Sequence, residues 1–191
     1  MNSIVAAKAL LRKQLRQERD LIPFAVRQSK SVSVARRLFD LPVLMGAKTV
    51  MGFISFASEV DTSLILERLL SHGKLVLVPR IDGARLYPVI YDASLELERS
   101  EYGTMEPVEK RTVPAELIDV VLVPGLGFDR RGARIGYGKG FYDKFLQTLP
   151  ASTVTIGIGF DEQIKDSLPE EDHDQRVEVV VSDSEAIFTK R

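Results

Sequence analysis

Apolar residues gather in short runs that polar or turn-forming residues separate. The clearest runs are TVMGFIS (49–55), KLVLVP (74–79), DVVLVPG (119–125), TVTIGIGF (153–160) and RVEVVVS (176–182). Continuous apolar runs of this length, rich in β-branched residues, are typical of strands buried on both faces of a parallel sheet. The pattern therefore predicts five buried strands.

The first segment has the spacing of an amphipathic helix over residues 3–20. Lys8, Arg12 and Arg16 follow one another at intervals of four residues. Residues four apart lie one turn apart on the same face, so these cations share a stripe. Such a stripe is commonly a solvated face, and it is also suited to holding an anion between adjacent turns.

Turn-forming residues bound the other helices. Pro23 fits the start of a helix that runs to about Phe39, and Pro42 ends it. Residues 61–73 form a compact helix, with the aspartate at the start as N-cap and the glycine at the end just past the last turn. A further helix is expected over 141–149, whereas 84–110 has the weak pattern of short strands and turns.

Strands that alternate with helices predict an α/β fold. The expected architecture is a three-layer α/β/α sandwich with a mainly parallel, Rossmann-like sheet. The 191 residues suffice for one hydrophobic core, which predicts a single domain over 1–191. Such sheets bind ligands beyond the carboxyl ends of their strands, which here means after Ser55, Pro79 and Val123.

Composition and charge narrow the function classes. The chain has 26 Lys and Arg against 27 Asp and Glu, a net charge of −1 that favours neither nucleic acid nor an anionic membrane as partner. It has no Cys, which excludes disulfides, thiolate metal sites and a Cys nucleophile. Its start lacks the apolar core of a signal peptide and no run is long enough to span a bilayer, so we expect a cytoplasmic protein without a membrane partner.

Glycines concentrate in PGLGFDRRGARIGYGKGFYD (124–143), where Gly136, Gly138 and Gly140 alternate between a predicted strand and a predicted helix. Glycine lets a ligand approach the backbone closely, and successive N–H groups then converge on an anion such as a phosphate. The spacing matches neither the Walker A loop nor the dinucleotide-binding fingerprint. A glycine-rich hairpin without a ligand has the same pattern.

Charged residues flank these glycines. Arg130, Arg131, Arg134 and Lys139 place four cations in ten residues, and Asp143 follows in the first turn of the next helix. A carboxylate there either caps the helix or holds Mg²⁺ against phosphates, since Mg²⁺ usually takes one or two carboxylates plus phosphate oxygens.

The segment PGLGFDRRGARIGYGKGFYDKFL closely resembles the signature of the 5-formyltetrahydrofolate cyclo-ligase family. The resemblance extends from about residue 8 to about residue 180. Its other elements, in family order, are KALLR (8–12), FISFASEVDT (53–62), VPR (78–80), MEP (105–107) and HD (173–174). Phe141 stands where many members have Tyr, and Glu178 stands where Asp is expected.

The resemblance implies an enzyme that uses ATP as co-substrate and Mg²⁺ as cofactor. Members of the family close 5-formyltetrahydrofolate into 5,10-methenyltetrahydrofolate and release ADP and phosphate. The expected route phosphorylates the formyl oxygen, after which N10 attacks the same carbon. The expected partners are these small molecules, and the expected assembly is a monomer or weak homo-oligomer.

The same resemblance assigns the site residues. The ATP-binding residues are Lys8, Ala9, Leu10, Leu11, Arg12, Arg134, Ile135, Gly136, Tyr137, Gly138, Lys139, Gly140, Phe141 and Tyr142. The folate-binding residues are Ile54, Glu59, Tyr137, Gly138, Lys139, Gly140 and Phe141. The catalytic residues are Arg134, Lys139 and Asp143, and the metal ligands are Asp143 and Asp174.

Residue chemistry alone leaves alternatives open at several of these positions. Glu59 also fits a surface acid in a loop, and Asp174 lies in EEDHD, a run that is more often solvated than ligating. The aromatic residues of the glycine segment also fit core packing. For the whole chain, the rival functions are a non-catalytic nucleotide- or folate-binding protein of the same fold and a dinucleotide-dependent oxidoreductase, which the glycine spacing disfavours.

Overall fold

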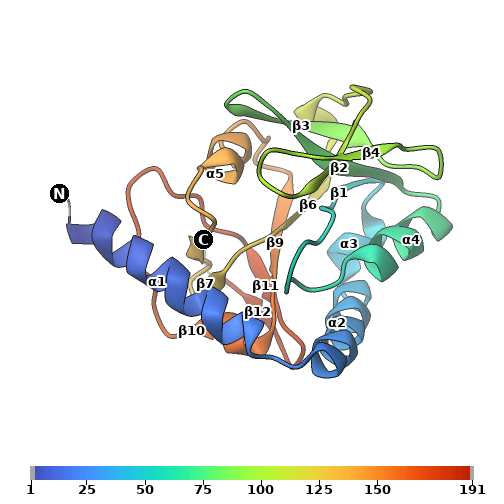
Figure 1. The fold of residues 1–191 in the computed structure, drawn as a ribbon. Helices are drawn as coiled ribbons and strands as arrows, with labels where there is room; N and C mark the ends of the chain where they lie inside the picture. The colour runs from blue at the N-terminus through green and yellow to red at the C-terminus, as the bar shows by residue number, and fades with distance from the viewer. Residues whose placement is uncertain (1–2, 190–191) are drawn as a thin grey trace.

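A large sheet occupies the middle of the molecule, with α2, α3 and α4 on one side and α1 and α5 on the other (Figure 1). The computed structural model describes residues 3–189. The strands of this sheet are β1 (Thr49–Met51), β2 (Leu75–Asp82), β3 (Arg85–Ile90), β6 (Val120–Val123), β9 (Val154–Ile158), β11 (Val179–Val181) and β12 (Ala186–Phe188). The helices are α1 (Ser3–Asp20), α2 (Phe24–Phe39), α3 (Pro42–Gly46), α4 (Ser63–Ser71) and α5 (Phe141–Leu146), with short 3-10 turns at Ala115–Leu117 and Asp161–Gln163.

Across residues 3–189 the main sheet has the strand order β12-β11-β9-β6-β1-β2-β3. The inner strands from β11 to β2 pair in parallel, whereas β12 and β3 pair antiparallel at the two edges. The mainly parallel, Rossmann-like sheet predicted from the sequence is therefore confirmed.

Neighbouring residues of a strand in the main sheet pack into different apolar clusters, one on each face of the sheet. Val50 of β1 packs with α2 and α4, and Met51 packs in the cluster that includes Phe145 of α5. Because both faces of the inner strands are covered, most of their buried residues are apolar, with Thr49 and Thr155 as buried polar exceptions. This confirms the three-layer α/β/α sandwich.

A second sheet lies beyond β6 and carries the start of the glycine segment. In it β7 (Gly127–Asp129) pairs with β8 (Arg134–Ile135) and with β10 (Ile164–Lys165). Leu15 of α1 packs in one buried cluster with Ile135. This contact fixes α1 beside the glycine segment.

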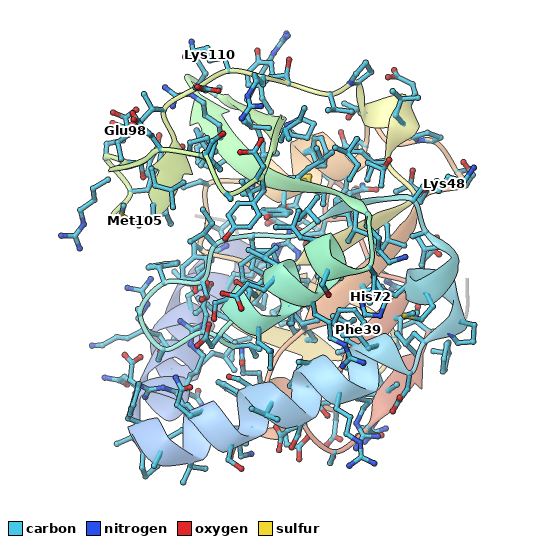
Figure 2. All side chains as sticks on the ribbon, turned by 90° about the vertical axis from the view of Figure 1, so that its right-hand side faces the viewer. Phe39, Lys48, His72, Glu98, Met105 and Lys110 are labelled. Carbon is cyan, nitrogen blue, oxygen red and sulfur yellow. The ribbon has the colours of Figure 1, made fainter. Side chains whose placement is uncertain are left out.

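Residues 84–110 form short strands and turns, as predicted. After β3, a hairpin of β4 (Leu97–Arg99) and β5 (Met105–Pro107) projects from the sheet. Figure 2 shows Glu98 and Met105 together on this β4–β5 hairpin, far from Phe39 and His72. Among residues 3–189 no helix is both long and apolar enough to cross a membrane.

The structure differs from the predicted elements around the turn after β1. The strand expected over 49–55 ends at Met51, because Ser55 and Thr62 hydrogen-bond each other through side chains and backbone in place of a neighbouring strand. The N-cap of α4 is Thr62, so the prediction of Asp61 was wrong. Asp61 instead accepts hydrogen bonds from Ser63.

Two helix ends also differ. Pro42 ends α2 as expected but begins the short α3, since its missing N–H is no loss in a first turn. The helix predicted over 141–149 ends at Leu146. Gly73, with φ of +70°, follows α4 as predicted.

Candidate active site

A cleft of about 920 Å³ opens where the parallel strands end. Ile54 reaches it after β1, Pro79 from β2 and Pro124 after β6. The sequence predicts ligand binding at these same three strand ends. The remaining walls come from α1, the glycine segment, the β4–β5 hairpin and residues 171–174.

Most of the predicted site residues line this one cleft. They are Lys8, Arg12, Ile54, Glu59, Arg134, Ile135, Gly136, Tyr137, Gly138, Lys139, Gly140, Phe141, Tyr142, Asp143 and Asp174. Three predicted ATP-binding residues do not line it, namely Ala9, Leu10 and Leu11. Leu10 is 71% exposed, and Leu11 packs against the cluster beneath α1.

The glycine loop is held against the basic stripe of α1. Arg12 donates from Nε to the carbonyl of Gly136 at 3.1 Å. A Cβ at Gly138, where φ is +93°, would lie 3.2 Å from the guanidinium of Arg12. Glycine therefore permits both the backbone conformation and the close packing. Gly140, with φ of +69°, then begins α5.

Opposite charges contact one another within the cleft. Arg134 donates from Nη2 to Oδ1 of Asp143 at 2.7 Å, and Lys8 donates from Nζ to Glu171 at 2.9 Å and to Asp174. Burial alone would raise the pKa of Asp174, but the hydrogen bond from Lys8 and other contacts outweigh it and lower the pKa. Both partners are therefore ionised at neutral pH.

Three groups here have the donor atoms of a metal site. Among residues 3–189, ligand atoms of Glu171, His173 and Asp174 lie within 4.8 Å of one another. Asp143 is outside this group but adjoins it, since its Oδ1 accepts the backbone N–H of Gln175 at 3.3 Å. Carboxylate oxygens are ligands that Mg²⁺ prefers, so this donor set fits that ion.

Glu59 also lines the cleft, and its side chain is buried. Its Oε1 accepts a hydrogen bond from the Tyr137 hydroxyl at 2.6 Å, and its Oε2 accepts the backbone N–H of Phe56 at 3.1 Å. Burial raises the pKa of Glu59, and these hydrogen bonds oppose that rise. Glu59 is thus a buried carboxyl group that two hydrogen bonds fix in the wall of the cleft, not a surface acid.

Aromatic rings also line the cleft. The Tyr137 ring lies 5.2 Å from Phe56 and 5.5 Å from the guanidinium carbon of Arg16. The Phe141 ring meets Tyr102 of the β4–β5 hairpin edge-on at 5.3 Å. The buried Tyr142 hydroxyl has no hydrogen-bond partner within residues 3–189.

Sequence reasoning missed one wall of the cleft and overcounted the cations. Tyr102, Thr104, Met105 and Glu106 of the β4–β5 hairpin line the cleft, and the MEP motif within them was the available signal. Glu171 and His173 also line it. Arg130 and Arg131 do not, because Arg130 pairs with Glu185, and Arg131 with Asp129 and Glu170.

Comparisons with known proteins agree over most of the chain. The model of the 5-formyltetrahydrofolate cyclo-ligase family matches residues 4–183. A 5-formyltetrahydrofolate cyclo-ligase from Mycolicibacterium smegmatis is 34% identical over 193 residues, which cover 97% of this chain and 98% of the relative. One from Escherichia coli K12 is 32% identical and covers 89% of this chain and 97% of its own. The NMR structure of 5,10-methenyltetrahydrofolate synthetase from Aquifex aeolicus has a TM-score of 0.85 at 28% identity, covering 96% of this chain and 93% of that one.

Proposed function

The chain belongs to the 5-formyltetrahydrofolate cyclo-ligase family, and from this we propose that it uses ATP and Mg²⁺ to convert 5-formyltetrahydrofolate to 5,10-methenyltetrahydrofolate, ADP and phosphate. The supporting observation is that one cleft holds two chemically different ends. A cation-rich glycine loop faces a buried carboxyl group, and the hydrogen bond from Tyr137 to Glu59 joins them. Two substrates that exchange a phosphoryl group need such adjacent sites.

We assign one end of the cleft to the ATP phosphates. It is formed by Lys8, Arg12, Arg134, Asp143 and Asp174 and is called the phosphate end below. Phosphates are bound by cations and by converging N–H groups, which the loop of residues 136–140 supplies. In the free protein these cations pair with carboxylates. Binding of ATP would replace those carboxylates with phosphate oxygens as the partners of the cations.

Asp143 and Asp174, with Glu171 beside them, would hold Mg²⁺. The ion would supply charge neutralisation at the transferring phosphoryl group. The carboxylates would hold the ion in place, and Arg134, which pairs with Asp143 in the free protein, lies beside the same site.

We assign the opposite end to the folate. It is formed by Ile54, Phe56, Glu59 and Tyr137 and is called the folate end below. A carboxylate has about four lone-pair sites, so Glu59 retains acceptor capacity beyond its bonds to Tyr137 and Phe56. Those sites suit the ring N–H and amino groups of the pterin, and the aromatic rings suit its flat faces.

In this reaction the protein positions the two substrates and forms no covalent bond with either. The formyl oxygen attacks the γ-phosphorus, and the bond to ADP breaks with its electron pair leaving on ADP. The lone pair of N10 attacks the activated carbon, N10 loses its proton, and phosphate leaves with the electrons of the C–O bond. Phosphoryl transfer needs alignment and charge neutralisation, and ring closure is intramolecular, so ordering the two substrates supplies much of the rate.

The test is whether the methenyl product forms, and the absorbance of that product measures its formation. Purified protein is mixed with 5-formyltetrahydrofolate, Mg²⁺ and ATP, and the control omits ATP. We expect an increase in absorbance that requires ATP, with one ADP released per product. Folate binding without any product would instead indicate a non-catalytic binding protein. A cytoplasmic location, a single domain over 1–191 and a monomer or weak homo-oligomer stay predictions from the sequence.

A further inference from the structure

Arg19 is an unusual residue because its whole side chain is buried. It lies in the last turn of α1 and is 2% exposed. It continues the basic stripe three residues beyond Arg16, yet it does not line the cleft as Lys8, Arg12 and Arg16 do. Burying a guanidinium is costly unless the charge is paired and hydrogen-bonded, so this position calls for a partner.

The side chain of Arg19 contacts the turn after β1 and the ring of Tyr137, whose centroid lies 5.9 Å from its guanidinium carbon. Its Nε donates to Oγ of Ser58 at 3.0 Å, and Ser58 in turn donates to Asp20. Its Nη1 lies 3.9 Å from Oε1 of Glu59. Ala57, in the same turn, is the one non-glycine residue within 3–189 with a positive φ, at +53°. Arg19 therefore holds a strained turn whose next residues are Ser58 and Glu59.

Glu59 is faced by groups from three elements. Tyr137 of the glycine loop and Tyr142 of α5 are both near it, and burial raises the pKa of each, so both stay neutral. The backbone N–H of Phe56 is also neutral. Arg19 of α1 is the group of this set that carries a positive charge. An uncharged residue at position 19 would leave Glu59 buried beside neutral partners.

We propose that Arg19 is a positioning residue for the folate, which keeps Glu59 oriented as a carboxylate that accepts hydrogen bonds from the N–H groups of the pterin. The inference rests on the proposed function, because it takes the folate as the ligand of Glu59. Arg19 touches no ligand in this arrangement. It acts through the charge on Nη1 and through its hydrogen bond to Ser58.

The test uses Arg19→Met, which keeps the length of the side chain and removes its charge. Calorimetry measures binding of 5-formyltetrahydrofolate, without ATP, across a series of pH values. Loss of the charge raises the pKa of Glu59 further, and each unit of rise reduces its ionised fraction about tenfold when the pH lies below the pKa. We therefore expect folate binding to weaken as the pH falls in both proteins, with the midpoint of this loss shifted to higher pH in Arg19→Met, and to recover as the pH rises.

Several variants separate this role from a structural one. Arg19→Lys keeps the charge and should retain the wild-type pH profile. Arg19→Gln repeats the uncharged test if the Met variant does not fold. Lys13→Met removes an exposed cation from the same helix, away from the cleft, and should change nothing. Glu59→Gln combined with Arg19→Met should show no pH dependence, because the titrating group is gone.

Two results would overturn the inference. One is an unchanged pH profile of folate binding in a folded Arg19→Met protein. The other is a loss that is equal at every pH and affects ATP as much as folate, which would indicate a purely structural role. Failure of the wild-type protein to form the methenyl product would count against the proposed function, whereas the calorimetric profile tests Arg19 separately.

Discussion

The charged side chains at the two ends of the cleft differ in their partners. At the phosphate end, the buried cations Lys8 and Arg134 contact carboxylates that remain partly exposed, such as the Asp143 side chain at 20%. At the folate end, Glu59 and Arg19 are buried, and the hydroxyl of Tyr137 occupies one oxygen of the acid. The phosphate end is thus a set of exchangeable ion pairs, and the folate end is a preorganised acceptor. Substitutions should therefore affect different ligands at the two ends.

The largest effect is expected at the phosphate end from Asp143→Asn. The amide keeps the shape and a hydrogen bond to Arg134, but it loses the charge that would hold Mg²⁺. We expect turnover to fall by roughly a thousandfold, as for loss of a main electrostatic contact to the transition state. Steady-state assays at saturating folate measure this, and thermal melting checks that the variant folds.

Asp172→Asn is the matched control, because Asp172 is exposed in the same acidic run as Asp174 but does not line the cleft. It should retain wild-type turnover. Full activity of Asp143→Asn would remove Asp143 from the metal site and leave it as a partner of Arg134.

Glu59→Gln should have the next largest effect, at the folate end. A hydrogen bond to a charged group is worth about 2 kcal/mol, so the KM for 5-formyltetrahydrofolate should rise roughly thirtyfold while the KM for ATP stays constant. Kinetics with each substrate varied in turn give both constants. A matching rise in the KM for ATP would contradict the separation of the two ends.

Lys8→Met should weaken ATP binding more modestly. Lys8 contributes one cation among several, and removing it leaves Glu171 and Asp174 without this partner beside the phosphates. We expect the KM for ATP to rise about tenfold, the size of one charge-assisted hydrogen bond. An unchanged KM for ATP in the folded variant would mean that Lys8 serves only to hold the 171–174 segment.

Tyr137→Phe should have the smallest effect, since it removes the hydroxyl that joins the two ends and keeps the ring. One hydrogen bond is worth about 1 kcal/mol, so the KM for folate should change by roughly fivefold. Measuring folate binding with and without a non-hydrolysable ATP analogue also shows whether the loop and Glu59 are coupled, since ATP itself would convert the folate. A wild-type difference between the two conditions that persists in Tyr137→Phe would exclude this hydrogen bond as the link.

The sequence was sufficient to predict the long elements and much of the cleft. The helical spacing of residues 3–20 predicts α1, the prolines at 23 and 42 bound α2, and the apolar runs predict the parallel strands, because these signals are local. The two-residue strands β8 and β10 have no local signal, since they exist only through pairing with β7. The ion pair of Lys8 with Asp174 joins residues 166 apart, a distance over which sequence spacing carries no information.

Arg19 shows a different limit of sequence reasoning. In the sequence it looks like one more cation on a solvated helix face, since the spacing cannot reveal that the turn of residues 56–59 covers it. The structure separates it from Arg12 and Arg16, which line the cleft. A charge pattern therefore predicts which residues share one face of a helix. Whether another segment buries a residue on that face decides the role of that residue.

The most direct measurement is calorimetry of both ligands with the two variants that act at opposite ends. ATP with Mg²⁺, and separately 5-formyltetrahydrofolate, are titrated into the wild-type protein, Asp143→Asn and Glu59→Gln. The proposed separation predicts that Asp143→Asn loses affinity for ATP with Mg²⁺ and keeps that for folate, while Glu59→Gln does the reverse. Loss of both affinities in each folded variant, or of the same affinity in both, would contradict it.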